Sequence, residues 1–265
     1  TCERHIAKEL SEFFTFFVPG YQFTPAFRNK IWDGKIRLYN LSSSVLYLGL
    51  LKYLEEFCEE RQYTFEYRDN VDCEDEFSTY HAEKFTQSLN LSSRGVPIQV
   101  RDYQLNALVH TMQRRRALLL SPTASGKSLI LYLILRMIQD MKHKKGLLIV
   151  PTTSLVEQMY SDFESYGYDS EKYCHKQYAG KDKFSDKFLT ITTWQSIYKN
   201  PPEYFEQFDF VLGDEAHQFK AKSLTTIMTG LNQASYRIGC TGTLDGTQTH
   251  KLVLEGLFGP VYRST

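Results

Sequence analysis

With 265 residues, the chain exceeds the usual size of one domain, so its length predicts a large domain and a smaller one. Its 31 Lys and Arg residues balance 31 Asp and Glu residues, which excludes nucleic-acid binding driven by net charge and leaves local basic patches. The five cysteines form no Cys-x-x-Cys pair and no apolar run spans a bilayer, which argues against a zinc site, a disulfide framework or a membrane protein and favours the cytoplasm.

The first 92 residues predict a small α+β domain. One amphipathic helix is indicated by apolar residues at helical spacing, namely Ile6, Leu10, Phe13, Phe14 and Phe17. A second helix is indicated in the same way by Leu48, Leu51, Leu54 and Phe57. Strands are predicted at Tyr21 to Phe23, Lys35 to Tyr39 and Tyr63 to Tyr67.

A basic segment with one tryptophan lies on a predicted hairpin of this domain. Its charged residues are Arg28, Lys30, Asp33, Lys35 and Arg37. Four positive charges and one negative charge leave a net charge of plus three around Trp32. Positive charge beside an aromatic ring suits a phosphate backbone or a splayed base, so we expect these basic residues and Trp32 to bind nucleic acid. The alternative is that Trp32 packs in the core of the hairpin.

The loop-forming segment from Asn90 to Pro97 predicts a domain boundary, which we place between residues 92 and 93. The chain then alternates helices with short apolar strands, predicted at Ala117 to Leu120, Gly146 to Val150, Phe188 to Thr192, Phe210 to Gly213 and Tyr236 to Cys240. Such strands are typical of a parallel sheet covered by helices on both faces, so residues 93 to 265 predict an α/β domain. Polar residues follow each strand, at the sheet edge where α/β proteins bind ligands.

The first predicted strand runs into a phosphate-binding pattern. Its residues are Ser121, Pro122, Thr123, Ala124, Ser125, Gly126, Lys127 and Ser128, and a leucine-rich helix follows. In such a loop the backbone amides and the helix N-terminus bind phosphates. We expect Lys127 to reach the β and γ phosphates of ATP, Ser128 to bind Mg²⁺, and Gly126 to allow close approach. The usual pattern has glycine where this chain has Ser121.

A second chemical pattern, Asp214-Glu215-Ala216-His217, follows the strand that ends at Gly213. We expect Asp214 to hold the Mg²⁺ ion and Glu215 to act as the general base that orients the attacking water. Adjacent carboxylates after a strand are more often a solvated loop. A phosphate loop upstream favours the catalytic interpretation.

The two patterns together resemble the Walker A loop and the DEAH box of superfamily-two helicases. The resemblance implies a RecA-like P-loop NTPase fold for residues 93 to 265. Arg101-Asp102-Tyr103-Gln104 is similar to the family's adenine-binding segment, so Arg101, Tyr103 and Gln104 are expected at the base. A glutamine amide can bond two edges of adenine.

Three further segments match the family's motifs in order. Pro151-Thr152-Thr153-Ser154-Leu155 and Thr192-Thr193-Trp194-Gln195-Ser196 resemble loops that contact a nucleic-acid backbone. The expected contacts are Thr152, Thr153, Thr193, Trp194 and Gln195. Thr241-Gly242-Thr243 resembles the motif that couples hydrolysis to strand movement, and His217 is expected to link the nucleotide to it. The alternatives are ordinary threonine helix caps for the two loops and a β-turn for the third segment.

The segment Trp32-Asp33-Gly34-Lys35, after an aromatic-rich helix, is similar to the N-terminal domain of UvsW-type recombination helicases of T-even phages. This resemblance implies an ATP-dependent DNA helicase that acts on branched DNA and R-loops in recombination, replication and repair. Its expected partners are single-stranded, forked or branched DNA and RNA–DNA hybrids. It is expected to work as a monomer in the cytoplasm of the phage's host.

We expect the chain to be an N-terminal fragment in which residues 93 to 265 form the first motor domain and the second is absent. Such a fragment hydrolyses ATP poorly, because the second domain supplies the arginine finger. An RNA helicase and a restriction-type DNA translocase are the alternatives within the motor class. A P-loop small-molecule kinase fits less well, since kinases lack the acidic and Thr-Gly-Thr motifs. A DNA-binding module without catalysis is a further alternative.

Overall fold

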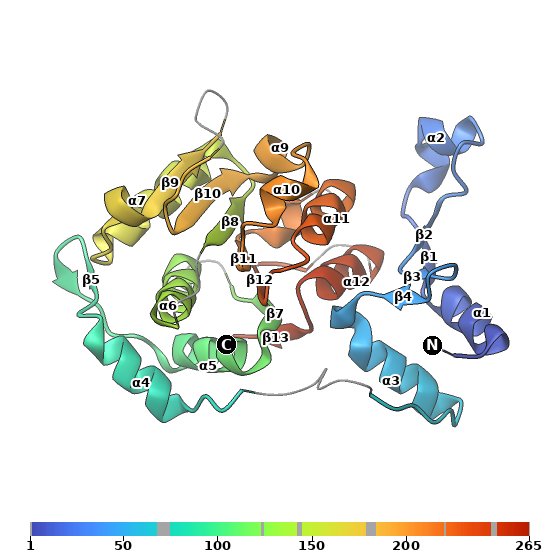
Figure 1. The fold of residues 1–265 in the computed structure, drawn as a ribbon, viewed down its shortest axis with the longest axis horizontal. Helices are drawn as coiled ribbons and strands as arrows, with labels where there is room; N and C mark the ends of the chain where they lie inside the picture. The colour runs from blue at the N-terminus through green and yellow to red at the C-terminus, as the bar shows by residue number, and fades with distance from the viewer. Residues whose placement is uncertain are drawn as a thin grey trace.

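The computed structural model describes residues 2–67, 75–122, 125–141, 145–178, 184–219, 221–244 and 248–264. A small N-terminal part lies beside a larger α/β part (Figure 1). The small part consists of α1 (Arg4–Phe13), β1 (Thr15–Phe17), the 3₁₀ helix η1 (Tyr21–Phe23), α2 (Pro25–Arg28), β2 (Lys35–Arg37), β3 (Tyr39–Asn40), β4 (Val45–Leu46), the 3₁₀ helix η2 (Leu48–Leu50) and α3 (Leu51–Glu60).

The predicted strand at Tyr21–Phe23 is wrong, because this segment forms η1. Gly20 precedes it in a left-handed conformation with φ of 71°, and Thr24 then caps α2 by accepting a hydrogen bond from the Phe27 amide. Two helical turns therefore replace the extended backbone, as Gly20 and Pro25 favour.

The predicted hairpin around Trp32 is also wrong. β2 exists but pairs antiparallel with β1, twenty residues earlier in the chain, rather than with a neighbouring strand. The predicted strand at residues 63–67 does not form. Instead, the Tyr63 ring lies 6.1 Å from the ring of Phe57 in α3, and its hydroxyl donates to Glu9 in α1. Tyr63 therefore packs this segment against both helices.

The described residues of the larger part form a seven-stranded sheet with the order β13-β7-β12-β11-β8-β10-β9, in which every neighbouring pair is parallel. The strands are β7 (Arg116–Leu120), β8 (Gly146–Val150), β9 (Cys174–Gln177), β10 (Leu189–Thr193), β11 (Phe210–Gly213), β12 (Tyr236–Thr241) and β13 (Val261–Arg263). The predicted parallel α/β fold is confirmed. The edge strands β9 and β13 were not predicted.

Side chains of the sheet alternate between two cores. In β7, Ala117 and Leu119 belong to the first core, while Leu118 belongs to the second. The first core is covered by α4 (Thr79–Ser88), α5 (Asp102–Arg114), α6 (Lys127–Asp140) and α7 (Thr153–Ser165), with α8 (Ser170–Tyr173) following α7. The second core is covered by α9 (Trp194–Ile197), α10 (Pro202–Phe205), α11 (Ala221–Gly230) and α12 (Gln248–Leu257), with the 3₁₀ helix η3 (Ala216–Gln218).

The second core continues into the small N-terminal part. Leu50 is fully buried in this core together with Leu254 of α12. The Tyr53 hydroxyl donates to Glu255 at 2.7 Å, and a Cβ atom at Gly49 would lie 1.8 Å from the Glu255 carbonyl oxygen. Glycine at position 49 therefore lets η2 pack directly on the backbone of α12.

The segment between the two parts packs against the larger one. In α4, Ala82 and Phe85 lie in the same core as Leu108 of α5. The predicted linker contains a short hairpin of β5 (Ser92–Ser93) and β6 (Val96–Pro97). The boundary at residue 92 stays a prediction, although α4 shares its core with the seven-stranded sheet. None of the described helices is both long and apolar enough to cross a membrane.

Candidate functional site

The phosphate-loop pattern and the acidic motif meet at one edge of the sheet. β7 and β11 flank β12, so Ser121 and Asp214 follow strands that are two positions apart. The Lys127 ammonium lies 2.5 Å from Glu215 Oε1, across 88 residues of sequence. These side chains are only 13% and 20% exposed, so water screens this ion pair weakly.

Gly126 is required by both its backbone and its surroundings. Its φ of 76° is left-handed, and a Cβ atom there would lie 2.6 Å from Gln104 Nε2. Ser121, where the usual pattern has glycine, is buried, and its hydroxyl lies 2.7 Å from that of Ser125. The serine thus closes the loop with a local hydrogen bond. Pro122 is exposed, and Thr123 and Ala124 lie outside the described residues.

Asp214 has the chemistry of a metal ligand. Its side chain is buried, and its Oδ1 atom has no hydrogen-bond partner among the described residues. Burial, reinforced by the negative charge of Glu215, raises the pKa of Asp214 to about 6. A buried carboxylate oxygen without a donor is costly, and a bound cation would offset that cost. The residues present therefore fit a divalent metal at Asp214.

The acidic motif is connected to Thr241 by hydrogen bonds. The backbone of Glu215 is in the left-handed region with φ of 48°, and its side chain contacts Lys127. His217 Nδ1 lies 3.4 Å from Glu215 Oε2 and 2.7 Å from the Thr241 hydroxyl. The Thr241 hydroxyl also donates to the Thr243 carbonyl at 2.8 Å. These contacts join His217 to the Thr241-Gly242-Thr243 segment, and its role in linking the nucleotide to this segment stays a prediction.

The segment expected at the adenine base lies against the phosphate loop. The Gln104 amide donates to the Ser125 carbonyl at 2.9 Å and accepts from the Arg101 amide at 3.1 Å. The Tyr103 hydroxyl donates to the same Ser125 carbonyl at 2.8 Å, and Arg101 donates to Tyr103. Gln104 is buried and both ends of its amide are engaged. Its role at adenine stays a prediction, and here the residue supports the loop.

The first of the two threonine loops presents accessible hydroxyl groups. Thr152 and Thr153 are exposed, and Thr152 caps α7 by accepting a hydrogen bond from the Leu155 amide. The helix-cap alternative is therefore correct for Thr152. Thr153, the first residue of α7, is not the capping residue.

The second threonine loop, Thr192 to Ser196, is mostly buried and is joined to the first loop by a hydrogen bond. Trp194 is only 8% exposed and packs in the second core, so its ring holds the loop in place rather than facing solvent. Thr193 is buried as well, and its hydroxyl bonds that of Ser196. Gln195 is exposed and donates to the Pro151 carbonyl at 3.2 Å, which joins the two loops. Thr193 and Trp194 are thus internal supports, and Gln195 remains accessible.

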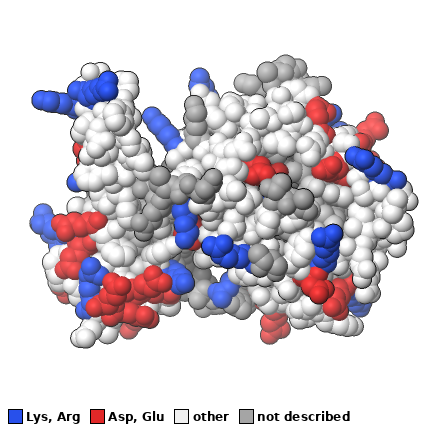
Figure 2. Space-filling view, turned by 180° about the vertical axis from the view of Figure 1, so that it is seen from behind, with Lys and Arg blue, Asp and Glu red and all other residues white. Residues whose placement is uncertain are grey.

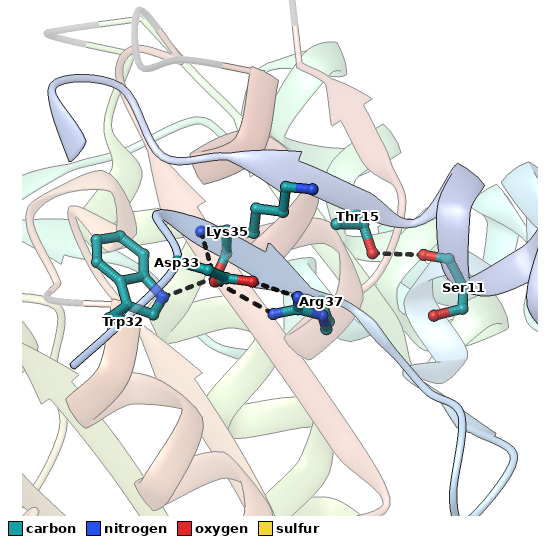
Figure 3. Close-up of polar contacts among 6 residues, drawn as sticks. All are labelled: Ser11, Thr15, Trp32, Asp33, Lys35 and Arg37. Atoms are coloured by element: carbon teal, nitrogen blue, oxygen red, sulfur yellow. Dashed lines mark hydrogen bonds and ion pairs between the residues drawn. The ribbon is translucent and has the colours of Figure 1, made fainter. Parts of the chain in front are cut away.

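The basic segment of the small part presents its charge outward. Arg37 pairs with Asp33, and the Trp32 indole donates to the Lys35 carbonyl at 2.9 Å (Figure 3). The Lys35 ammonium lies over the Phe17 ring. Trp32 is half-buried and belongs to neither core, which argues against the core-packing alternative. With Arg37 neutralised, the exposed cations are Arg28 and Lys30 of the α2 end.

Trp32 lines a surface cavity of about 780 Å³ together with Phe27, Arg28, Lys30 and Ile31. Lys and Arg side chains gather at the end of the small part that carries α2, whereas acidic side chains gather at the end formed by α1 and α3 (Figure 2). The basic residues and the aromatic residues Phe27 and Trp32 therefore lie together at the α2 end of the small part.

Tyr166, which no sequence pattern singled out, lies against the phosphate-loop helix. Its hydroxyl is 2.8 Å from that of Ser128. The two residues are 38 positions apart, and a tyrosine after a helix carries no recognisable signal for such a contact.

Two family models match the chain. The model described as Type III restriction enzyme, res subunit, matches residues 97–246, and the model of the N-terminal domain of the DNA helicase UvsW matches residues 1–68.

The ATP-dependent DNA helicase uvsW of Enterobacteria phage T4 is 33% identical over 267 residues, which cover 99% of this chain and 53% of that protein. The DNA 3'-5' translocase XPB2 of Sulfurisphaera tokodaii is 27% identical over 217 residues, covering 81% of this chain and 47% of that protein. The chain thus spans about half the length of the curated relatives it matches. A crystal structure of the phage T4 UvsW helicase superimposes with a TM-score of 0.91 at 33% identity, covering 99% of this chain and 94% of that chain.

Proposed function

Because the chain belongs to the UvsW family of superfamily-two helicases, we propose that it supplies the ATP-binding motor domain of an ATP-dependent DNA helicase. The observation that carries this proposal is the contact of Lys127 with Glu215, because it brings the phosphate loop and the acidic motif to one point. A triphosphate requires both at once: cations and amides for its charge, and a carboxylate that orients water.

Each residue of this edge then has a role. Lys127 leaves Glu215 and binds the β and γ phosphates, which frees the Glu215 carboxylate to accept a proton from the attacking water. Ser128 and Asp214 would hold Mg²⁺, and the ion supplies charge stabilisation at the phosphate oxygens. His217 and Thr241 hold the acidic motif against the segment that follows β12.

The DNA-binding surface in this proposal has two parts. Thr152, Thr153 and Gln195 contact the phosphate backbone beside the motor, while the basic α2 end of the small part, with Trp32, binds a second region of the nucleic acid. We propose single-stranded, forked or branched DNA and RNA–DNA hybrids as ligands, with the protein acting as a monomer in the host cytoplasm.

The decisive experiment measures binding of a fluorescent ATP analogue to the chain. Lys127→Ala removes the phosphate contact, and we expect it to abolish binding in the presence of Mg²⁺. Lys52→Ala is the matched control, because Lys52 is an exposed lysine of α3 that pairs with Glu56 of the same helix. Retained binding by Lys127→Ala would overturn the nucleotide site.

The substrate class is tested by ATP hydrolysis in the full-length protein, with single-stranded, forked and four-way DNA and with RNA as separate activators. Strongest stimulation by forked or four-way DNA supports the proposal. Strongest stimulation by RNA would favour the RNA-helicase alternative instead.

A further inference from the structure

The Ser128 hydroxyl is held from outside the phosphate loop. Ser128 is the second residue of α6, directly after Lys127. Its Oγ atom lies 2.8 Å from the hydroxyl oxygen of Tyr166, which follows the last residue of α7. Tyr166 is only 9% exposed, so this contact is shielded from water.

Asp162 is a second candidate partner of the same hydroxyl. It lies four residues before Tyr166, on the same side of the last turn of α7. Burial raises the pKa of Asp162, and a hydrogen bond with Ser128 partly opposes this shift. Either hydroxyl of the Ser128–Tyr166 pair can donate; when Tyr166 donates to the Ser128 oxygen, one lone pair of that oxygen is engaged. One lone pair of that oxygen is then left for a cation.

The Tyr166 side chain is itself fixed. Its ring lies 5.3 Å from the ring of Tyr132 in α6, at an interplanar angle of 48°, and its amide bonds the carbonyls of Asp162 and Phe163. Both its backbone and its ring are therefore constrained. A hydroxyl on such a side chain has a defined position relative to Ser128.

We propose that Tyr166 and Asp162 are positioning residues that hold the Ser128 hydroxyl in the orientation that a divalent cation requires. This inference rests on the proposed function, because it needs Ser128 to be a ligand of the nucleotide-bound Mg²⁺. Metal ligands oriented by a second layer of hydrogen bonds lose about 10- to 100-fold in metal affinity when that layer is removed. Tyr166 acts through Ser128, whereas the charge of Asp162 also acts on Asp214.

The test is a Mg²⁺ titration of fluorescent ATP-analogue binding by the whole chain, with the analogue chosen to resist hydrolysis. For Tyr166→Phe, which removes only the hydroxyl, we expect the Mg²⁺ concentration for half-maximal binding to rise about tenfold. Binding without Mg²⁺ should be unchanged. Tyr168→Phe is the matched control, because the Tyr168 hydroxyl is equally buried but bonds Gln139.

A second variant and a second background keep the inference falsifiable. Asp162→Asn should shift the Mg²⁺ dependence in the same direction, which covers the case in which Tyr166→Phe fails to fold by circular dichroism. In a Ser128→Ala background, Tyr166→Phe should add no further shift, since the group it positions is gone.

The possible outcomes separate the inference from the function beneath it. If the unaltered chain shows no Mg²⁺-dependent nucleotide binding, the proposed nucleotide site fails. If the unaltered chain binds but both variants keep its Mg²⁺ dependence within about twofold, well below the loss expected for a second layer, only the positioning role is overturned. A tenfold shift in Tyr168→Phe would equally overturn it, because the effect would then belong to the aromatic core.

Discussion

Replacing Gly126 by alanine perturbs the phosphate loop in two ways that the structure separates. The backbone at Gly126 has φ of 76°, where an alanine costs roughly 1–2 kcal/mol. The new Cβ would also lie 2.6 Å from Gln104 Nε2, so the buried Gln104 amide must move away from Ser125. A buried amide deprived of its partner costs about 1–3 kcal/mol more. We expect Gly126→Ala to lower the free energy of unfolding by about 2–5 kcal/mol in total.

Gly95→Ala is the matched control for the backbone cost. Gly95 has φ of 79°, and no atom lies within 4 Å of a Cβ built there. Urea unfolding followed by circular dichroism should therefore show a loss of about 1–2 kcal/mol for Gly95→Ala, with an unchanged m-value in both variants.

The difference between the two variants measures the Gln104 contact. In a Gln104→Ala background the clash disappears, so Gly126→Ala should then cost no more than Gly95→Ala. Equal losses for the two glycine variants in the unaltered background would refute the reasoning, because they would show that Gln104 moves aside without cost.

Three further predictions concern the second loop, a surface ion pair and the small part. Trp194→Ala should lower the free energy of unfolding by about 3–5 kcal/mol, whereas Gln195→Ala should weaken DNA binding in a filter assay without changing the urea midpoint. The guanidinium of Arg115 lowers the pKa of Asp75, so the ion pair stabilises the fold at neutral pH and this stabilisation is lost as the pH falls below about 4. The difference in free energy of unfolding between the unaltered chain and Asp75→Asn should therefore shrink and vanish as the pH falls through this range. Trp32→Ala should weaken DNA binding with an unchanged melting temperature, and a lower melting temperature would restore the core-packing alternative.

The inner strands were predictable because burial on both faces demands continuous apolar sequence. β8 and β11 have the predicted bounds, and β12 extends one residue beyond them. The edge strand β9, Cys-His-Lys-Gln, pairs on one side only and carries two polar residues that face outward in part, so it has no such pattern. Apolar periodicity identifies the centre of a parallel sheet better than its edges.

The small part was harder to predict for a different reason. Its strands have two or three residues, too few for alternation to be distinguished from chance. β2 pairs with β1 across η1 and α2, and no local turn signal specifies that pairing. The aromatic alternation at residues 63–67 forms no strand, and its first residue, Tyr63, instead contacts α1 and α3.

Some contacts of the candidate site were likewise predictable from the sequence and others were not. Lys127 and Glu215 were predictable because each follows a strand end, and the order of a parallel sheet brings strand ends to one edge. Gln104 of α5 bonds the Ser125 carbonyl of the phosphate loop, and Ser128 of α6 bonds Tyr166 just after α7, so both hydrogen bonds depend on how separate helices pack.

α7 shows what this packing adds. The helix begins at the exposed Thr153, directly after Thr152, and ends one residue before Tyr166, which bonds Ser128. Its 13 residues span about 20 Å at 1.5 Å per residue. A single helix packed in the first core therefore connects the candidate nucleic-acid loop, where Thr152 caps its first turn, to the candidate nucleotide site, where Tyr166 bonds Ser128.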